Sequence, residues 1–177
     1  MQKIKLLNHL NSIVLITVLV FALTSCVGYR LGNNKPNKFK DIKSLSVPII
    51  GSDVIQPKLQ SILTNSIIRS IQEQGSYQIR KEKDSDASLI ARIKQINRKQ
   101  LRANRENVLE TTEMEFSIEL EYKVINNITG ETLEKGITTG KSTSYLNTNF
   151  QLTESRSLRS AAEKVAISLT SKLSEGY

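Results

Sequence analysis

The stretch EFSIELEYKV, residues 115–124, decides the fold class of this chain. Its apolar residues alternate with charged or small polar ones, the pattern of a strand with one face in a core and the other in water. A shorter alternation over residues 89–94 precedes it. The residues NNITG, 126–130, supply a turn before a returning strand around 133–139. The middle of the chain is therefore predicted to be an antiparallel meander.

Helical patterns lie on both sides of this meander. Apolar residues recur at helical spacing over 59–71, where Pro57 suits the first helical position and Gly75 fits the residue just past the end. A second apolar stripe runs from residue 153 to 173, before Gly176 as a stop signal. We interpret both stripes as ordinary core.

The N-terminal part of the domain adds strands of a different kind. A short apolar run over 42–50, interrupted by Pro48, predicts a first strand that ends early or lies near an edge, and residues 77–80 predict another strand after the first helix. Strand, helix and strand with short links predict a βαβ unit with parallel strands. The expected fold is α+β: a two-layer sandwich with a mixed four- to five-stranded sheet and two helices packed on one face.

The N-terminus resembles a bacterial export signal. Two lysines precede an apolar run over 13–23, which is too short to span a bilayer comfortably, and LTSC at 23–26 ends it like a lipobox. We therefore expect residues 1–25 to be a cleaved lipoprotein signal peptide and Cys26 to carry a diacylglyceryl group. A plain signal peptide with an incidental Cys, or a short amphipathic anchor, is the alternative.

Processing at that site would divide the rest of the chain in two. Residues 26–41 would form a lipidated tether rich in Asn and Lys, and 42–177 a single α+β domain. Acyl chains on Cys26 would anchor the protein to a membrane. Because Val27 rather than Asp follows the Cys, we expect the outer membrane.

The composition leaves little room for catalysis. The chain has one Cys and one His, and His9 lies inside the expected signal peptide. Nucleophile pairs that need His, and metal sites built from His or Cys, are thereby excluded, and no Gly-rich phosphate loop is present. We expect no enzymatic activity, no cofactor and no metal. The net charge of +8 suggests an anionic partner, but nucleic acid is a poor candidate because the chain looks exported and no aromatic residues interleave the basic ones.

One segment concentrates the positive charge. Six cations with no acid between them are the candidate contact residues: Arg92, Lys94, Arg98, Lys99, Arg102 and Arg105. If the strand continues, four of them share one face: Arg92, Lys94, Arg98 and Arg102. Phosphates of lipid A or core sugars would suit such a row, because guanidinium groups bind phosphate in a bidentate way. The alternative is that cross-strand ion pairs with Glu115, Glu119 and Glu121 neutralise the row.

Three further side chains have no clear place in this pattern. Tyr145, Leu146 and Phe150 lie in a polar stretch between the last strand and the last helix. They either pack under that helix as a small satellite cluster or form an exposed docking patch.

Several landmarks together resemble the LptE family, the lipopolysaccharide-assembly lipoproteins. In chain order they are CVGYRLG at 26–32, IKSLSVP at 42–48, Pro57 and Leu59, Leu63 and Thr64, and Asp86 and Ala87. The chain departs from the family pattern at Val27, which is inserted into the usual Cys-Gly-Tyr, and over 49–52, after the Val-Pro.

This resemblance implies a function without catalysis. Members of the family are anchored in the inner leaflet of the outer membrane. They plug a large β-barrel, LptD, and assist its assembly and the delivery of lipopolysaccharide to the outer leaflet. A different class stays open: an outer-membrane lipoprotein that regulates a periplasmic cell-wall enzyme or scaffolds a secretion pore.

Overall fold

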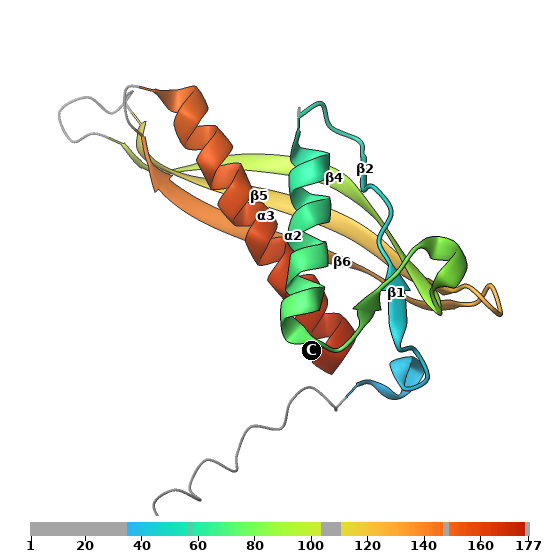
Figure 1. Ribbon diagram of the computed structural model, residues 1–177. Coiled ribbons are helices and arrows are strands. Elements are labelled where there is room, and N and C mark those ends of the chain that lie inside the picture. The colour runs from blue at the N-terminus through green and yellow to red at the C-terminus, as the bar shows by residue number, and fades with distance from the viewer. Residues whose placement is uncertain (1–34, 57, 104–110, 147–148, 176–177) are drawn as a thin grey trace, which may run out of the picture. The chain divides into compact units, whose positions relative to one another are not determined.

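The predicted meander is present in the computed structural model as three long antiparallel strands (Figure 1). They are β4 (Ala87–Ala103), β5 (Thr111–Asn126) and β6 (Thr132–Tyr145). The turn between β5 and β6 closes through the Asn126 N–H, which donates to the Glu131 carbonyl at 2.8 Å. Gly130 occupies the left-handed region there, at φ 72°, where glycine meets no steric penalty.

The structure describes residues 35–56, 58–103, 111–146 and 149–175. All of them belong to one compact unit that spans residues 34–177. The expected signal peptide and the lipidation site at Cys26 lie outside the described residues. Within the described ranges, no helix combines the length and the apolar character that a membrane crossing requires.

Shorter strands complete a mixed sheet beside β4. β1 (Ser44–Ser46) lies between β3 (Gln78–Ile79) and β4 and is parallel to both, so the predicted parallel pairing is confirmed. β2 (Gly51–Ser52) pairs with β4 further along. The sheet therefore has six strands, in the order β3-β1-β4-β5-β6 with β2 beside β4.

The strand count exceeds the predicted four to five because the run over 42–50 is not one strand. Pro48, which cannot donate a hydrogen bond to a sheet, lies between β1 and β2. Ile50 turns into the core, where its N–H donates to Thr64 Oγ1 at 3.2 Å. Ile49 points outward and is 79% exposed.

The first predicted helix is α2 (Leu59–Gln74). Pro57 lies outside the described residues, and the residue before the helix is Lys58, at φ 65°. The helix ends as expected at Gly75, whose N–H donates to the Ile71 carbonyl at 3.1 Å.

The second helix, α3 (Phe150–Glu175), begins three residues earlier than predicted. Asn149 caps it, because its Oδ1 accepts the Leu152 N–H at 3.0 Å. The stop residue Gly176 lies outside the described residues.

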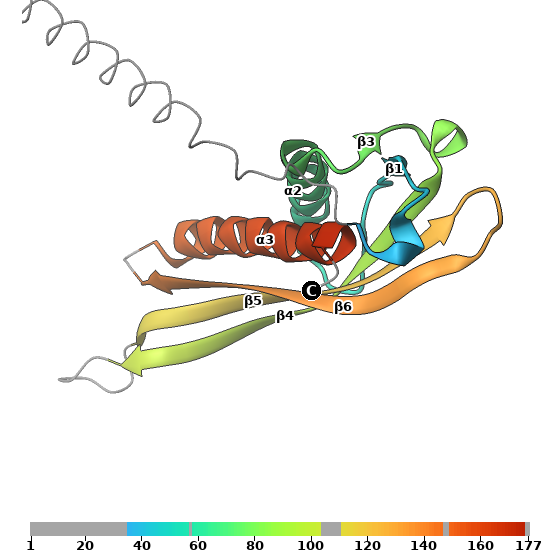
Figure 2. The same ribbon diagram turned by 90° about the horizontal axis from the view of Figure 1, so that it is seen from below.

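Both helices cover the same face of the sheet, so the two-layer α+β class is confirmed (Figure 2). α3 packs on β5 and β6, and α2 packs on α3 and contacts β3. Fully buried side chains from both layers form the core, among them Leu63, Ile67, Phe116, Leu120, Val165 and Leu169. No described helix covers the opposite face of β4, β5 and β6, which is called the open face below.

Candidate functional site

Five of the six candidate cations lie on β4, and Arg105 lies outside the described residues. The register of β4 against β5 shifts between Ile93 and Gln95, which leaves one extra residue on β4. Such a bulge inverts the alternation of faces. Arg98 therefore lies opposite Phe116, on the helix-covered face, whereas Arg92 lies on the open face. The prediction of one shared face is wrong.

On the covered face, Arg98 is held by a carboxylate of α3. Its Nε and Nη2 atoms lie 2.6 and 2.5 Å from Glu154 Oε1. The Glu154 side chain is only 17% exposed, so water screens the ion pair poorly. This arginine fastens α3 to the sheet.

On the open face, Arg92 and Lys94 share one acid. Arg92 Nη1 lies 2.7 Å from one oxygen of Asp53, and Lys94 Nζ lies 2.8 Å from the other. The hydrogen bonds from Lys94 and Arg92 lower the pKa of Asp53, and the same contact raises the pKa of Lys94. Lys94 also lies 3.9 Å from Glu121.

Of the three glutamates predicted to neutralise the row, only Glu121 approaches a cation of β4, Lys94 at 3.9 Å. Arg102 uses a glutamate outside that prediction. Arg102 Nε lies 3.1 Å from Glu113 Oε2. Glu115 pairs with Lys141 of β6 at 3.3 Å rather than with β4. Among the described cations of the basic row, only Lys99 has no ion-pair partner. The acids that neutralise the row most closely, Asp53 and Glu154, are distant in sequence, and no sequence pattern marks them.

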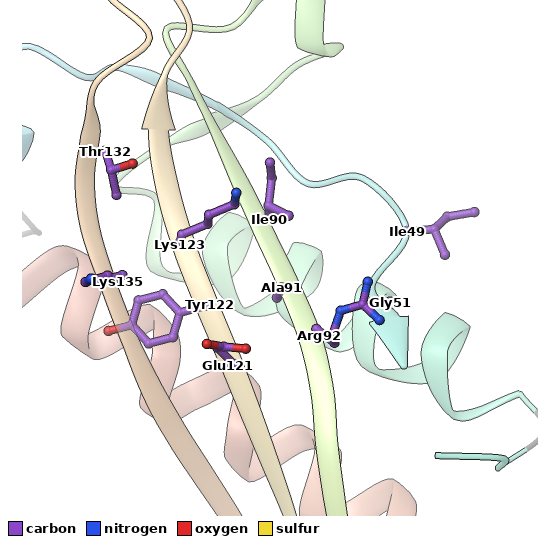
Figure 3. Close-up of a pocket in the computed structure, with 10 residues that line it drawn as sticks. All are labelled: Ile49, Gly51, Ile90, Ala91, Arg92, Glu121, Tyr122, Lys123, Thr132 and Lys135. Carbon is purple, nitrogen blue, oxygen red and sulfur yellow. The ribbon is translucent and has the colours of Figure 1, made fainter. Parts of the chain in front are cut away.

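A pocket of about 580 Å³ opens on the same face, beside the Arg92–Asp53 pair (Figure 3). It lies across β4, β5 and β6 and is bounded on one side by the segment that leads into β2. Lys123 of β5 is directly opposite Lys135 of β6 in the ladder. Like charges in directly opposite positions destabilise a sheet unless an anion lies between them. Neither lysine has an ion-pair partner among the described residues.

The walls of this pocket combine charge with apolar surface. Figure 3 shows Ile90 beside Lys123, and Ile49 across from them near Gly51. Ile49 is 79% exposed and Ile90 38% exposed, so both present apolar surface to solvent here. Arg92 stands at the rim. Two unpaired lysines next to exposed isoleucines suit an amphiphile with anionic head groups.

Tyr122 supports the pocket between β5 and β6. Its hydroxyl donates to Glu134 Oε1 at 3.0 Å, and its ring lies close over Gly136, where an added Cβ would be 3.1 Å from the hydroxyl. Burial, and then the charge of Glu134, raises the pKa of Tyr122 to about 12. The phenol therefore stays neutral at ordinary pH. Because Tyr122 alternates with Glu121 and Lys123 and is buried like Leu120, its ring lies on the helix-covered side of the sheet, beneath the pocket.

Sequence reasoning missed Lys123 and Lys135 as a pair. The alternation over 115–124 does place Lys123 on the outer face. Its juxtaposition with Lys135 depends on the register of β5 and β6, which the turn over 126–131 sets.

The three unassigned side chains divide between the two alternatives. Phe150 belongs to α3 and packs against Phe116, with ring centroids 6.5 Å apart. Leu146 is half-buried. Tyr145, at the end of β6, is 68% exposed.

Comparison with known proteins identifies a family for this chain. The family model LptE, described as lipopolysaccharide-assembly, matches residues 42–173. No curated protein matches the chain.

Solved structures share the architecture at low sequence identity. Protein XCC0632 from Xanthomonas campestris is similar with a TM-score of 0.55 and 12% identity, over 73% of this chain and 82% of its own. A neuraminyllactose-binding hemagglutinin homolog from Helicobacter pylori gives 0.54 and 13%, over 84% and 90%. The hypothetical protein CT253 from Chlamydia trachomatis gives 0.50 and 8%, over 77% and 99%. At these identities the likeness shows a common fold.

Proposed function

The chain belongs to the LptE family of lipopolysaccharide-assembly proteins, and from this membership we propose that it is a non-catalytic lipoprotein of the bacterial outer membrane. In this role the domain plugs a large β-barrel translocon of the LptD kind, helps it to assemble and assists the delivery of lipopolysaccharide to the outer leaflet. A lipid on Cys26 holds the domain at the membrane.

The family match is the observation that carries this proposal. It begins before β1 and ends within the last turn of α3, so it includes α2, nearly all of α3 and the whole sheet. The resemblance therefore concerns the complete domain rather than a shared fragment.

The lipopolysaccharide contact is proposed for the open face of the sheet. Lipid A combines phosphate groups with acyl chains, and the pocket offers Lys123 and Lys135 next to exposed isoleucines. Among the cations of the basic row, Arg92 stands at the rim of the pocket. Arg92, Lys94 and Arg102 are already paired with acids, whereas Lys99, further along β4, is free to bind. Arg98 is directed to α3, so a contact with ligand would require it to leave Glu154.

The barrel contact is proposed to use the remaining polar surface. The open face carries both signs of charge, with Glu115 and Glu119 on β5 and Lys141 on β6. Mixed charges of this kind give register and specificity to an interface with a polar lumen wall. Arg105, in the segment between β4 and β5, belongs to the same proposed contact.

The lipopolysaccharide contact is tested by direct binding. The full-length protein in mild detergent is titrated with purified lipopolysaccharide, as wild type and as Lys123→Glu/Lys135→Glu. A matched variant, Lys40→Glu/Lys83→Glu, changes the same net charge at exposed positions outside the pocket. We expect the pocket variant to bind at least about tenfold more weakly and to lose most of the salt dependence, because two phosphate contacts disappear.

Two controls keep this result specific. Thermal unfolding checks that both variants are folded, and Lys40→Glu/Lys83→Glu should bind as the wild type does. Equal weakening of both variants would show that net charge alone drives binding, and unchanged binding of the pocket variant would remove lipopolysaccharide from this site.

A further inference from the structure

The backbone groups along the free edge of β6 have no part in the proposed function, which uses only the Lys135 and Lys141 side chains of this strand. Within the described residues β6 pairs with β5 on one edge and with no strand on the other. The ladder keeps one register over almost its whole length and shifts only next to Val124. A regular unpaired edge presents a row of N–H and C=O groups that another extended chain can pair with.

The opposite side of the long strands differs. β1 and β2 cover the first half of β4. Beyond Ile93 the β4 ladder shifts three times, before Gln95, before Arg102 and after Arg102. Bulges of this kind interrupt pairing and protect an edge. β6 is therefore the strand that can accept a partner.

Two contacts show which backbone groups of β6 face outward. The Leu146 N–H donates to the Thr112 carbonyl at 2.9 Å, so even-numbered residues bond toward β5. Lys172 of α3 donates to the Ile137 carbonyl at 2.9 Å from the other side. By alternation, the N–H and C=O groups of Thr139, Lys141 and Thr143 point to the free edge.

The surroundings of this edge are basic. On α3, residues Lys164, Ser168 and Lys172 are spaced four apart and share one side of the helix. Ser168 accepts the Thr138 hydroxyl at 2.9 Å, which places that side of α3 over β6. Lys164 is exposed there, and Lys141 is 62% exposed on the open face.

Acids near the edge do not balance these lysines. Glu134, the acid of β6 itself, is 16% exposed and pairs with Lys38 at 3.1 Å. Glu115 reaches Lys141 from β5, and Glu175 ends α3. Glu119 and Glu121 lie one strand further from the edge, opposite Thr139 and Ile137. An incoming strand would thus meet Lys135, Lys141, Lys164 and Lys172.

We propose that the free edge of β6 docks an extended acidic segment of a partner protein by strand addition. The partner's backbone pairs with Thr139, Lys141 and Thr143, and its N–H replaces Lys172 at the Ile137 carbonyl. Acidic side chains lie opposite Lys135 and Lys141, six positions apart, and an apolar side chain covers Ile137, which is 54% exposed. A second copy of this chain fits poorly, because antiparallel pairing would bring the same lysines of two copies together.

The test uses a synthetic peptide of alternating Thr and Val residues with two Glu residues six positions apart, labelled with a fluorophore. Anisotropy measures its binding to the full-length protein in mild detergent. Hydrogen exchange then locates it: we expect protection of the Thr139, Lys141 and Thr143 amides, and no change at Thr138 and Ser142, which already bond to β5. A peptide with Lys in place of Glu should bind at least about tenfold more weakly, because two cross-strand attractions become repulsions.

The protein variant Lys141→Glu/Lys164→Glu avoids the lipopolysaccharide pocket. It should weaken binding of the acidic peptide at least about tenfold, whereas Lys40→Glu/Lys83→Glu should leave peptide binding unchanged. Both variants should still bind lipopolysaccharide. Loss of lipopolysaccharide binding with intact peptide binding would instead be a failure of the proposed function alone. Equal binding of both peptides, protection on β4, or concentration-dependent dimers that protect the same amides without peptide would overturn the strand-addition proposal.

Discussion

Asp86 joins β1 to β4 through one carboxylate oxygen. Its Oδ2 accepts the N–H groups of Lys43 and Ser44 at 2.9 and 2.8 Å and the Ser44 hydroxyl at 2.9 Å. These hydrogen bonds, first that from the Lys43 backbone, lower the pKa of Asp86. Asp86, one of the residues that resemble the LptE family, thus has a structural role.

This pairing predicts a pH-dependent stability. The carboxyl of Asp86 has an ordinary pKa near 4 in the unfolded chain and a lower pKa in the folded protein. Its contribution to the free energy of unfolding is therefore complete above about pH 4 and is lost as the pH falls through the folded pKa. We expect Asp86→Asn to reduce the free energy of unfolding by about 1 kcal/mol at neutral pH, a value already discounted for solvent exposure.

Urea unfolding at a series of pH values measures this difference. The gap between wild type and Asp86→Asn should close as the pH approaches 2, and Asp84→Asn, at an exposed residue of η2 (Glu82–Asp84), should leave stability unchanged. A gap that is constant with pH would show that the carboxylate charge does not matter.

Gly140 lets the backbone of α3 lie directly on β6. An added Cβ would come within 2.5 Å of the Val165 nitrogen and closer still to the Ala161 carbonyl oxygen, and neither backbone atom can move without shifting the helix. We expect Gly140→Ala to destabilise the protein by about 1–3 kcal/mol in chemical unfolding. Gly51→Ala is the matched control, since its Cβ would meet only the Arg92 guanidinium at 3.4 Å. Equal effects of the two substitutions would contradict this view of the contact.

At the scale of elements, one bulge decides what the basic strand can do. The buried apolar residues of β4 are two apart up to Ile93, but the next core-facing one is Ile96, three positions on. That change of spacing is the trace of the bulge in the sequence. It turns Arg98 toward α3 and leaves Lys99 on the open face.

The Arg98–Glu154 ion pair should therefore stabilise the packing of α3 on the sheet. We expect Arg98→Glu and Glu154→Arg each to destabilise by about 1–2 kcal/mol, because each leaves two like charges in a partly buried place. The double variant should recover about 1 kcal/mol of the summed loss. Urea unfolding of all four proteins gives this coupling, and strictly additive effects would rule the contact out.

The elements themselves were predictable from local patterns, and their long-range contacts were not. The alternation over 115–124 and the Gly75 stop correctly identified β5 and the end of α2. The break at Pro48 and the cap at Asn149 also have local causes, so both boundaries are predictable from the sequence. By contrast, Asp53 and Glu154 reach the basic row only through the tertiary fold, and Lys123 meets Lys135 only through the strand register.

At the scale of the whole molecule, the two faces of the sheet have different roles. The helices cover one face and bury the apolar core, while the other face carries the pocket and most of the basic row. An uncovered polar face on a rigid two-layer domain suits a protein that acts by contact rather than by chemistry. The net charge of +8 adds a long-range attraction to anionic surfaces.

The central claim, a plug for a lipopolysaccharide translocon, is tested most directly by extracting the full-length protein from the membranes of its host cells in gentle detergent and identifying what remains bound by mass spectrometry. We expect a large β-barrel in near-equal amount, and a Cys26→Ser variant that is no longer lipidated should recover much less of it. Recovery of a periplasmic cell-wall enzyme, a secretion-pore component or a self-oligomer without any barrel would contradict the account.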